Sequence, residues 1–346
     1  VISEYIMLGD KFGASFNKDD IIPEAAGEMF DGWAAVTTGN NKASLKNGSQ
    51  SSAPTEYIIE DVYTKADGAW MNQLKNTLEF PIDLIIDPGY PEECKLAIFN
   101  AFCQENTDPS FIRNDINVLM CEYDLMSSVT PTDVADYVRS LPETSNTRNL
   151  SIYSQWYKIL DPIGGVNQII IPPTVSMAHL LSYNAIALNQ GTHQPIAGIN
   201  RAVIDGVLAI SENPLPEQKE EYFSSRINYT EVSRYNTAIM SQRTREKYVD
   251  NTALQFLNNS ITTNRMVKEL EKLARVFLFE YNDATTLSNL RKVLNQYIAK
   301  YVENRTLQYA VIDVQKDAYS EEAIDVMVSI KYTNSIEVIN IDLIIE

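Results

Sequence analysis

The sequence of 346 residues is short of the side chains on which most catalytic and metal sites depend. It contains two histidines, His179 and His193, and neither has a carboxylate or a cysteine at the spacing of metal ligands. The Gly-rich loops that cradle nucleotide phosphates and the G-x-S-x-G turn of serine hydrolases are absent. A nucleophile–histidine relay or a histidine-based metal site would have to use one of these two histidines. We therefore expect structural roles for both, and neither a metal nor a cofactor.

Cysteine is also scarce. Cys94, Cys103 and Cys121 are odd in number and lack the spacing of a metal site. Such a set predicts reduced, partly buried thiols, as is usual for proteins of a reducing cytoplasm.

Positively charged residues are outnumbered by negatively charged ones, and long apolar runs are absent. The chain has 28 Lys and Arg against 46 Asp and Glu, a formal net charge of −18. Binding to nucleic acid needs clustered cations, so this charge argues against it. No apolar run approaches the roughly 20 residues of a membrane helix, and we expect no membrane insertion. No basic leader is visible, and since residue 1 is Val rather than Met we expect a processed product or a fragment.

An alternation of strands and helices begins near residue 80. Short apolar runs bounded by turn residues predict strands, and apolar residues at helical spacing predict helices between them. A helix that begins at Pro131 has Thr130 as its expected N-cap. The expected strands lie at 82–86, 115–124, 150–161 and 166–173, and the expected helices at 92–106 and 130–141. This order predicts a parallel α/β layer.

The last hundred residues form a second block. Residues 261–280 predict a helix that runs into a short apolar strand at 276–280, and residues 285–304 predict a strongly amphipathic helix with Asp283 as its N-cap. Three strands are expected after it, at 306–314, 323–332 and 336–345. In the second of them, Ile324, Val326, Val328 and Ile330 alternate with mostly polar residues and predict one buried face. The fold class is thus α+β or α/β: a mixed β-sheet core with flanking helices, plus an irregular outer region that contains β-strands.

The end of the chain is an apolar strand. Its residues alternate in the manner of a half-buried strand, and no polar tail follows. An exposed edge strand needs a partner for its backbone. We take the apolar residues of this segment as candidates for contact with another subunit: Ile336, Val338, Ile339, Ile341, Leu343 and Ile345.

Two further groups of charged residues are candidate sites. Asp83 and Asp87 bracket the first strand, at whose carboxyl end ligands bind in open α/β sheets, so an enzyme with an acidic strand-end site is the alternative function. The other interpretation, which we favour, is that Asp87 caps the turn at Asp-Pro-Gly. A basic cluster stands out in this acidic chain: Arg226, Arg234, Arg243, Arg245 and Lys247. Two interpretations of it carry equal weight, a contact between subunits and an ordinary solvated face.

The first 78 residues predict an irregular, β-containing region with a long polar run at 37–54. Trp33 and Trp70 could serve there as stacking platforms for a glycan on a host surface, but packing in a core is the interpretation we prefer for both.

The order of segments from about residue 80 to the end resembles the tail sheath proteins of contractile-tailed bacteriophages. The resemblance rests on a Pro-rich turn, IIIPPTVSMAHLL, followed by a helix and a Gly-containing loop; a later helix with Asn264-Arg265; and the stretch VFLFEYND. In that stretch the matching positions are Val276, Phe277, Phe279, Glu280, Asn282 and Asp283. The usual Ala-Gly after the Pro turn reads Met177-Ala178 here, which indicates a divergent branch such as that of very large phages.

The resemblance implies a structural protein rather than an enzyme. It implies a sheath subunit of the virion, made in the host cytoplasm, that stacks in helical rings around a tail tube and contracts to drive the tube through the host envelope for genome ejection. Its expected partners are neighbouring sheath subunits, the tail tube protein, and the baseplate and tail terminator proteins. It further implies three regions: a variable outward-facing region at 1–78, an α/β sheath domain at 79–225 and a tube-facing sheath core at 226–346.

Overall fold

The structure is a computed structural model of the whole chain, and it describes residues 73–333. Gaps in this range lie at 78, 91, 106, 108–110, 122–135, 137, 143, 145, 162–166, 187–192, 235 and 247–252. The chain divides into two compact units, 1–57 and 58–346, and every described residue belongs to the second. The predictions for Trp33, Trp70, the helix start at Thr130 and Pro131, Lys247 and the terminal strand lie outside the described residues.

A four-stranded parallel sheet is the first layer, in the order β1 (Leu84–Ile86), β2 (Asn117–Cys121), β3 (Leu150–Tyr153) and β7 (Ile227–Asn228). The predicted parallel layer is therefore confirmed, with helix α6 (Glu92–Phe102) as the crossover between β1 and β2. β7 lies just beyond residue 225 and pairs with β3. The three predicted regions themselves stay a prediction.

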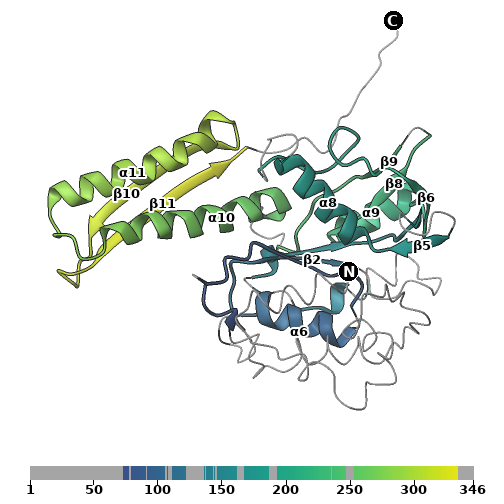
Figure 1. Cartoon of the computed structure of the whole chain (residues 1–346), viewed down its shortest axis with the longest axis horizontal. Coiled ribbons are helices and arrows are strands. Elements are labelled where there is room, and N and C mark those ends of the chain that lie inside the picture. The colour runs from purple at the N-terminus through teal and green to yellow at the C-terminus, as the bar shows by residue number, and fades with distance from the viewer. Residues whose placement is uncertain are drawn as a thin grey trace, which may run out of the picture. The chain divides into compact units, whose positions relative to one another are not determined.

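Helices cover this sheet on both faces, which explains why its strands are buried and mostly apolar. Val118 and Met120 of β2 point into a core with α6, whereas Leu119 points into a second core with Met177 and Leu181 of α8 (Pro173–Ile186). Figure 1 shows α6 and α8 on opposite sides of β2. Strands buried on both faces need no alternation of polar residues, because successive side chains both enter apolar cores.

The stretch 150–161 forms two strands, whereas the sequence predicted one. β3 ends at Tyr153, and β4 (Tyr157–Leu160) belongs to another, antiparallel sheet between β5 (Gln168–Ile171) and β6 (Val207–Ile210). The break occurs at Gln155, whose φ of 65° is left-handed and whose side-chain oxygen accepts a hydrogen bond from the Thr230 backbone N–H at 2.7 Å. The strand predicted at 166–173 thus exists, but as part of the second sheet.

Short elements complete this part of the chain. They are α9 (Pro216–Ser224) and the two-stranded antiparallel sheet of β8 (Thr230–Val232) and β9 (Thr237–Ile239). With the hairpin described next, the mixture of helices, one parallel sheet and several antiparallel sheets confirms the predicted α+β class.

A third core lies between two long helices and a β-hairpin, which we call the hairpin module. It consists of α10 (Leu257–Ala274), α11 (Ala284–Glu303), β10 (Leu307–Lys316) and β11 (Ile324–Tyr332). Leu290, Leu294 and Ile298 of α11 are at most 3% exposed in this core. Asp283 caps α11 as predicted, because its carboxylate accepts the Thr286 N–H at 2.8 Å.

The apolar stretch 276–280 is not a strand, and that prediction is wrong. A single 3₁₀ turn (η5, Arg275–Phe277) is followed by a loop to α11 in which Phe279 is fully exposed and left-handed, with φ 70°. A strand needs a neighbour to pair with, and among the described residues none lies beside this segment.

Candidate functional site

The hairpin of β10 and β11 has two outer edges. Its strands pair with each other over nine residue pairs, and within the described part of the chain no further strand pairs with either. The outer edge of a strand carries backbone N–H and C=O groups with the geometry to bind another strand. The hairpin is therefore a candidate site for strand addition.

The two faces of the hairpin differ. Ile312, Val314, Val328 and Ile330 face the core of the module, as the alternation in β11 predicted. On the opposite face Tyr309, Val311 and Met327 are between 51% and 69% exposed. Val326 lies on the inward side but is still 39% exposed, because the core beneath it is incomplete.

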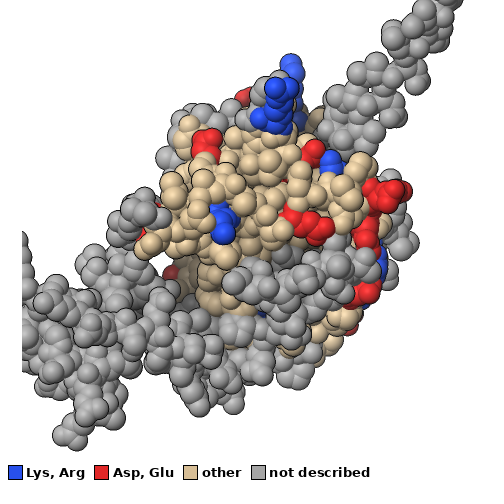
Figure 2. All heavy atoms as spheres, turned by 90° about the vertical axis from the view of Figure 1, so that its right-hand side faces the viewer, with Lys and Arg blue, Asp and Glu red and all other residues tan. Residues whose placement is uncertain are grey.

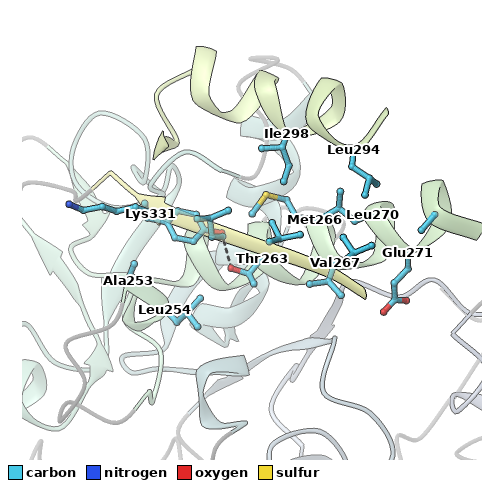
Figure 3. A pocket seen from close by; sticks show the side chains of 15 residues that line it. Ala253, Leu254, Thr263, Met266, Val267, Leu270, Glu271, Leu294, Ile298 and Lys331 are labelled. Atoms are coloured by element: carbon cyan, nitrogen blue, oxygen red, sulfur yellow. Dashed lines mark hydrogen bonds between the residues drawn. The ribbon is translucent and has the colours of Figure 1, made fainter. Parts of the chain in front are cut away.

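That incomplete region is a groove of about 790 Å³ between β11 and helices α10 and α11 (Figure 3). Apolar side chains dominate its walls, and they come from all three elements. Those labelled in Figure 3 include Met266, Val267 and Leu270 of α10 together with Leu294 and Ile298 of α11. Glu271 and Lys331 are the charged residues of the lining. A ligand for this groove must present apolar side chains.

One end of the groove is closed by a polar contact. The Tyr332 hydroxyl lies 2.7 Å from the Thr263 hydroxyl and donates to the Asn259 carbonyl at 3.2 Å. Burial raises the pKa of Tyr332, so the hydroxyl stays neutral and keeps its proton for this bond. The contact holds the end of β11 on α10. The six terminal residues predicted to contact another subunit lie outside the described residues.

The predicted basic cluster is largely buried inside the subunit. Arg243 and Arg245 are 7% and 4% exposed. Arg245 donates to the backbone carbonyls of Val138 and Leu141, at 3.0 Å for the latter, and the Arg243 guanidinium lies 4.4 Å from the centre of the Phe223 ring.

The remaining described members of the cluster differ in exposure. Arg226 donates to the Arg245 carbonyl at 3.0 Å, and Arg234 is exposed. Arg243 and Arg245 therefore make their contacts inside the subunit. Arg234 is the exposed described residue of the cluster and stays a candidate for the predicted charged contact. Sequence alone could not separate these roles, because buried and exposed arginines look alike in a linear pattern.

A second exposed apolar area lies on the sheet of β4, β5 and β6. Leu160, Ile170 and Leu208 are each between 44% and 50% exposed there. Figure 2 shows the corresponding face of the molecule as mainly uncharged surface, with separate Lys and Arg side chains and with acidic side chains gathered toward one side. Among the described residues on this face, the Lys and Arg side chains do not form a cationic patch of the kind that binds nucleic acid.

The acidic strand-end site is sealed. Asp87 is fully buried, and one carboxylate oxygen accepts the N–H groups of Gly89 and Tyr90 at 2.9 and 2.7 Å. The other oxygen lies 2.5 Å from Lys95 Nζ, which is also fully buried, and accepts the Cys121 N–H at 3.1 Å. The turn-capping interpretation is thus confirmed, and both oxygens are occupied.

No observation in the described residues favours a catalytic or metal site. Asp83, at the other end of β1, pairs with Lys268 at 2.9 Å. His179 stacks on Tyr183 with ring centres 6.1 Å apart. Within the described ranges no three His, Cys, Asp or Glu side chains converge as metal ligands, and no helix is both long and apolar enough to cross a membrane.

The three cysteines are predicted to resist thiol reagents in the folded protein. Each is at most 1% exposed, and burial together with the neighbouring Asp87 charge raises the pKa of Cys121 to about 12. A thiol reagent at about pH 8 should react roughly 100-fold more slowly with the native chain than with the urea-unfolded chain, since the thiolate is the nucleophile. Equal rates in the two states would contradict the burial of all three thiols.

The fold is that of contractile sheath proteins. No protein-family model matches the sequence, and no curated protein sequence matches it. Among solved structures, the chain is similar to one from the baseplate of the anti-feeding prophage: TM-score 0.60, 14% identity, covering 91% of this chain and 86% of that one. The helical sheath of the anti-feeding prophage in its contracted state gives the same TM-score and identity, with 90% and 85% covered. A sheath complex of an extracellular contractile injection system, PVC, gives 0.60 at 16% identity, with 78% and 74% covered.

Proposed function

We propose that this chain is a structural subunit of a contractile tail sheath, not an enzyme. The observation that carries the proposal is the combination of the sheath fold with a hairpin above an apolar groove, whose outer edges pair with no other strand among the described residues. A subunit that transmits force along an assembly needs such a connection to its neighbours, whereas a monomeric enzyme has no use for one.

The connection is strand addition. The terminal segment of a neighbouring copy, with Ile339, Ile341, Leu343 and Ile345 on one face, has the alternation that a third strand beside β11 requires. Its backbone pairs with the edge of β11, and its apolar face enters the groove beside Val267 and Leu270. Each hydrogen bond contributes about 1 kcal/mol net, and each buried aliphatic side chain about 1.5–3 kcal/mol. A few such pairs make a firm link that survives rigid-body rotation of the subunits.

The finer assignment is to a bacteriophage virion. The subunits are made in the host cytoplasm and polymerise as helical rings around a tail tube, and contraction drives the tube through the host envelope during genome ejection. Neighbouring copies, the tube protein, the baseplate and the tail terminator are the partners. Of the described members of the basic cluster, Arg234 is the exposed one and is the candidate for a charged contact between copies. The resemblance of the sequence to phage tail sheath proteins is what supports the assignment to a phage.

Electron microscopy of the protein with its native ends tests the proposal. We expect tubes or polysheaths with a regular helical repeat. The same preparation lacking residues 334–346 should contain subunits that do not polymerise, because the donated strand is missing. A full-length protein that stays monomeric under all conditions, and that turns over a small molecule, would overturn the assignment.

A further inference from the structure

Helix α10 belongs to two cores at once. Leu257 and Ile261 near its start pack in the core beside the parallel sheet, and Met266 with Leu270 and Leu273 packs in the core of the hairpin module. The orientation of the module on the sheet therefore depends on how α10 is held. Where the helix crosses the amino ends of β1, β2 and β3, it also makes polar contacts with them.

These polar contacts come from one stripe of the helix. Ser260, Asn264 and Lys268 are spaced four residues apart, so they lie one above another on the same face. Their partners all lie at or just before the amino ends of β1, β2 and β3. The stripe crosses the amino-terminal edge of the parallel sheet.

The two buried members of the stripe form a closed network. The Asn264 amide donates to the side-chain oxygens of Asn117 and Asn149 at 2.9 and 3.0 Å. Asn117 in turn donates to Ser260 at 2.8 Å, and Ser260 donates to the Arg148 carbonyl at 2.8 Å. Asn117 and Asn149 are fully buried and Asn264 is 4% exposed. Because these groups are buried, they cannot exchange their partners for water, and each hydrogen bond keeps one geometry.

The third member completes the contact at the rim. Lys268 Nζ donates to the Ile82 carbonyl at 2.6 Å and lies 2.9 Å from Asp83 and 3.3 Å from Asp115. Burial alone would raise the pKa of Asp115, but hydrogen bonds from Arg113 and the charge of Lys268 outweigh it and hold the pKa below its usual value. The Asp115 carboxylate is therefore charged at neutral pH.

The two faces of α10 constrain the helix differently. Apolar packing is not directional, so the face toward the module permits small rotations and shifts at little cost. Buried hydrogen bonds are directional, and breaking one leaves an unsatisfied group at a cost of about 1–3 kcal/mol. The polar stripe thus selects one angle and one register of the helix against three strands.

We propose that Ser260, Asn264 and Lys268 form a positioning joint that sets the orientation of the hairpin module relative to the parallel sheet. The joint keeps the strand-accepting edge of β11 at a defined angle to the body of the subunit. In the assembly, the joint transmits force from the linked strands to the parallel sheet while the angle between the module and the sheet stays constant. That last role rests on the proposed sheath function, whereas the orientation of the module in the single subunit does not.

The test measures that orientation directly. Spin labels are placed on exposed sites of the body and the module, with Lys158→Cys and Ser288→Cys, and the distance distribution is recorded by pulsed electron paramagnetic resonance. The three native cysteines are buried and do not compete for the label in the folded protein. The labelled parent should give one narrow distribution.

In that background Asn264→Leu removes the side-chain amide donor, so that the side-chain oxygens of Asn117 and Asn149 lose the hydrogen bonds that Asn264 gives them. A tilt of about 15°, the usual scatter of helix packing angles, moves a point about 15 Å along the helix by about 4 Å. We expect the distance distribution to shift or broaden by about this amount while the circular dichroism spectrum stays native. Asn295→Leu, the same change on the exposed side of α11, should leave the distribution unchanged.

A folded Asn264→Leu variant with the parental distance distribution would overturn the proposal. If that variant does not fold, Lys268→Met decides the question by the same measurement, because it removes the rim contacts of a partly exposed residue. Since the labels report on the unassembled subunit, failure of the joint and failure of sheath assembly are distinguishable. If the unassembled Asn264→Leu subunit keeps the parental distance distribution and the unsubstituted protein forms tubes, the joint alone is refuted. If the substitution alters the distance but the unsubstituted protein never polymerises, only the sheath function is refuted.

Discussion

Replacing Val326 with aspartate is expected to abolish assembly while leaving the subunit folded. Val326 lines the groove beside β11 and is 39% exposed, so the single subunit can solvate a carboxylate there. A docked apolar strand would remove that water. Burying an unpaired polar group costs about 3 kcal/mol, and more if charged, which weakens each link at least about 100-fold. The measurement is the protein concentration at which tubes first sediment.

Met327→Asp is the matched control for this experiment. It makes the same kind of change at the next residue of β11, on the face that points away from the groove, where Met327 is 69% exposed. We expect its assembly to remain close to that of the parent and the melting temperatures of the two variants to be similar. If Met327→Asp blocks assembly and Val326→Asp does not, the neighbour docks on the outer face, and the groove is not the site.

Lys95→Met is expected to give the largest loss of stability. Lys95 and Asp87 are both fully buried and 2.5 Å apart, and Lys95 also donates to the Cys121 carbonyl at 2.9 Å. Removal of the lysine leaves the carboxylate without its compensating charge between β1 and β2. Breaking one partner of a buried pair costs about 3–5 kcal/mol, and equilibrium unfolding in urea measures it.

The double variant Lys95→Met with Asp87→Asn separates the charge effect from packing. The asparagine oxygen can still accept the Gly89 and Tyr90 N–H groups and keep the turn, but it carries no charge. We expect the double variant to recover a large part of the lost free energy of unfolding. A loss of less than about 1 kcal/mol in the single variant would mean that the pair contributes no more than an exposed salt bridge does.

Several elements of the fold could be predicted from sequence because their causes are local. The cap at Asp283 and the apolar stripe of α11 depend on residues three or four positions apart, and the alternation in β11 depends on positions two apart. The turn at Asp87 likewise depends on neighbouring residues, the sequence Asp87-Pro88-Gly89. The inward face of β11, one wall of the candidate site, was therefore predictable.

The remainder of the candidate site was not predictable in this way. The groove exists only because α10, α11 and β11 converge from separate parts of the chain. The stripe of Ser260, Asn264 and Lys268 looks like an ordinary solvated helix face until strand ends from residues 82, 117 and 149 are brought against it. The resemblance to sheath proteins indicated the fold, but it did not identify these contacts.

The sequence by itself determined those helices and strands whose apolar residues recur at a regular spacing. It also showed that the usual catalytic motifs are absent. Tertiary structure decided which apolar segments became strands: 150–161 is split at Gln155 between two sheets, and 276–280 stays outside any sheet. It also decided that Arg243 and Arg245 are buried. The physical reason is common to all of these: pairing and burial depend on neighbours distant in the chain, and a linear pattern records only the near ones.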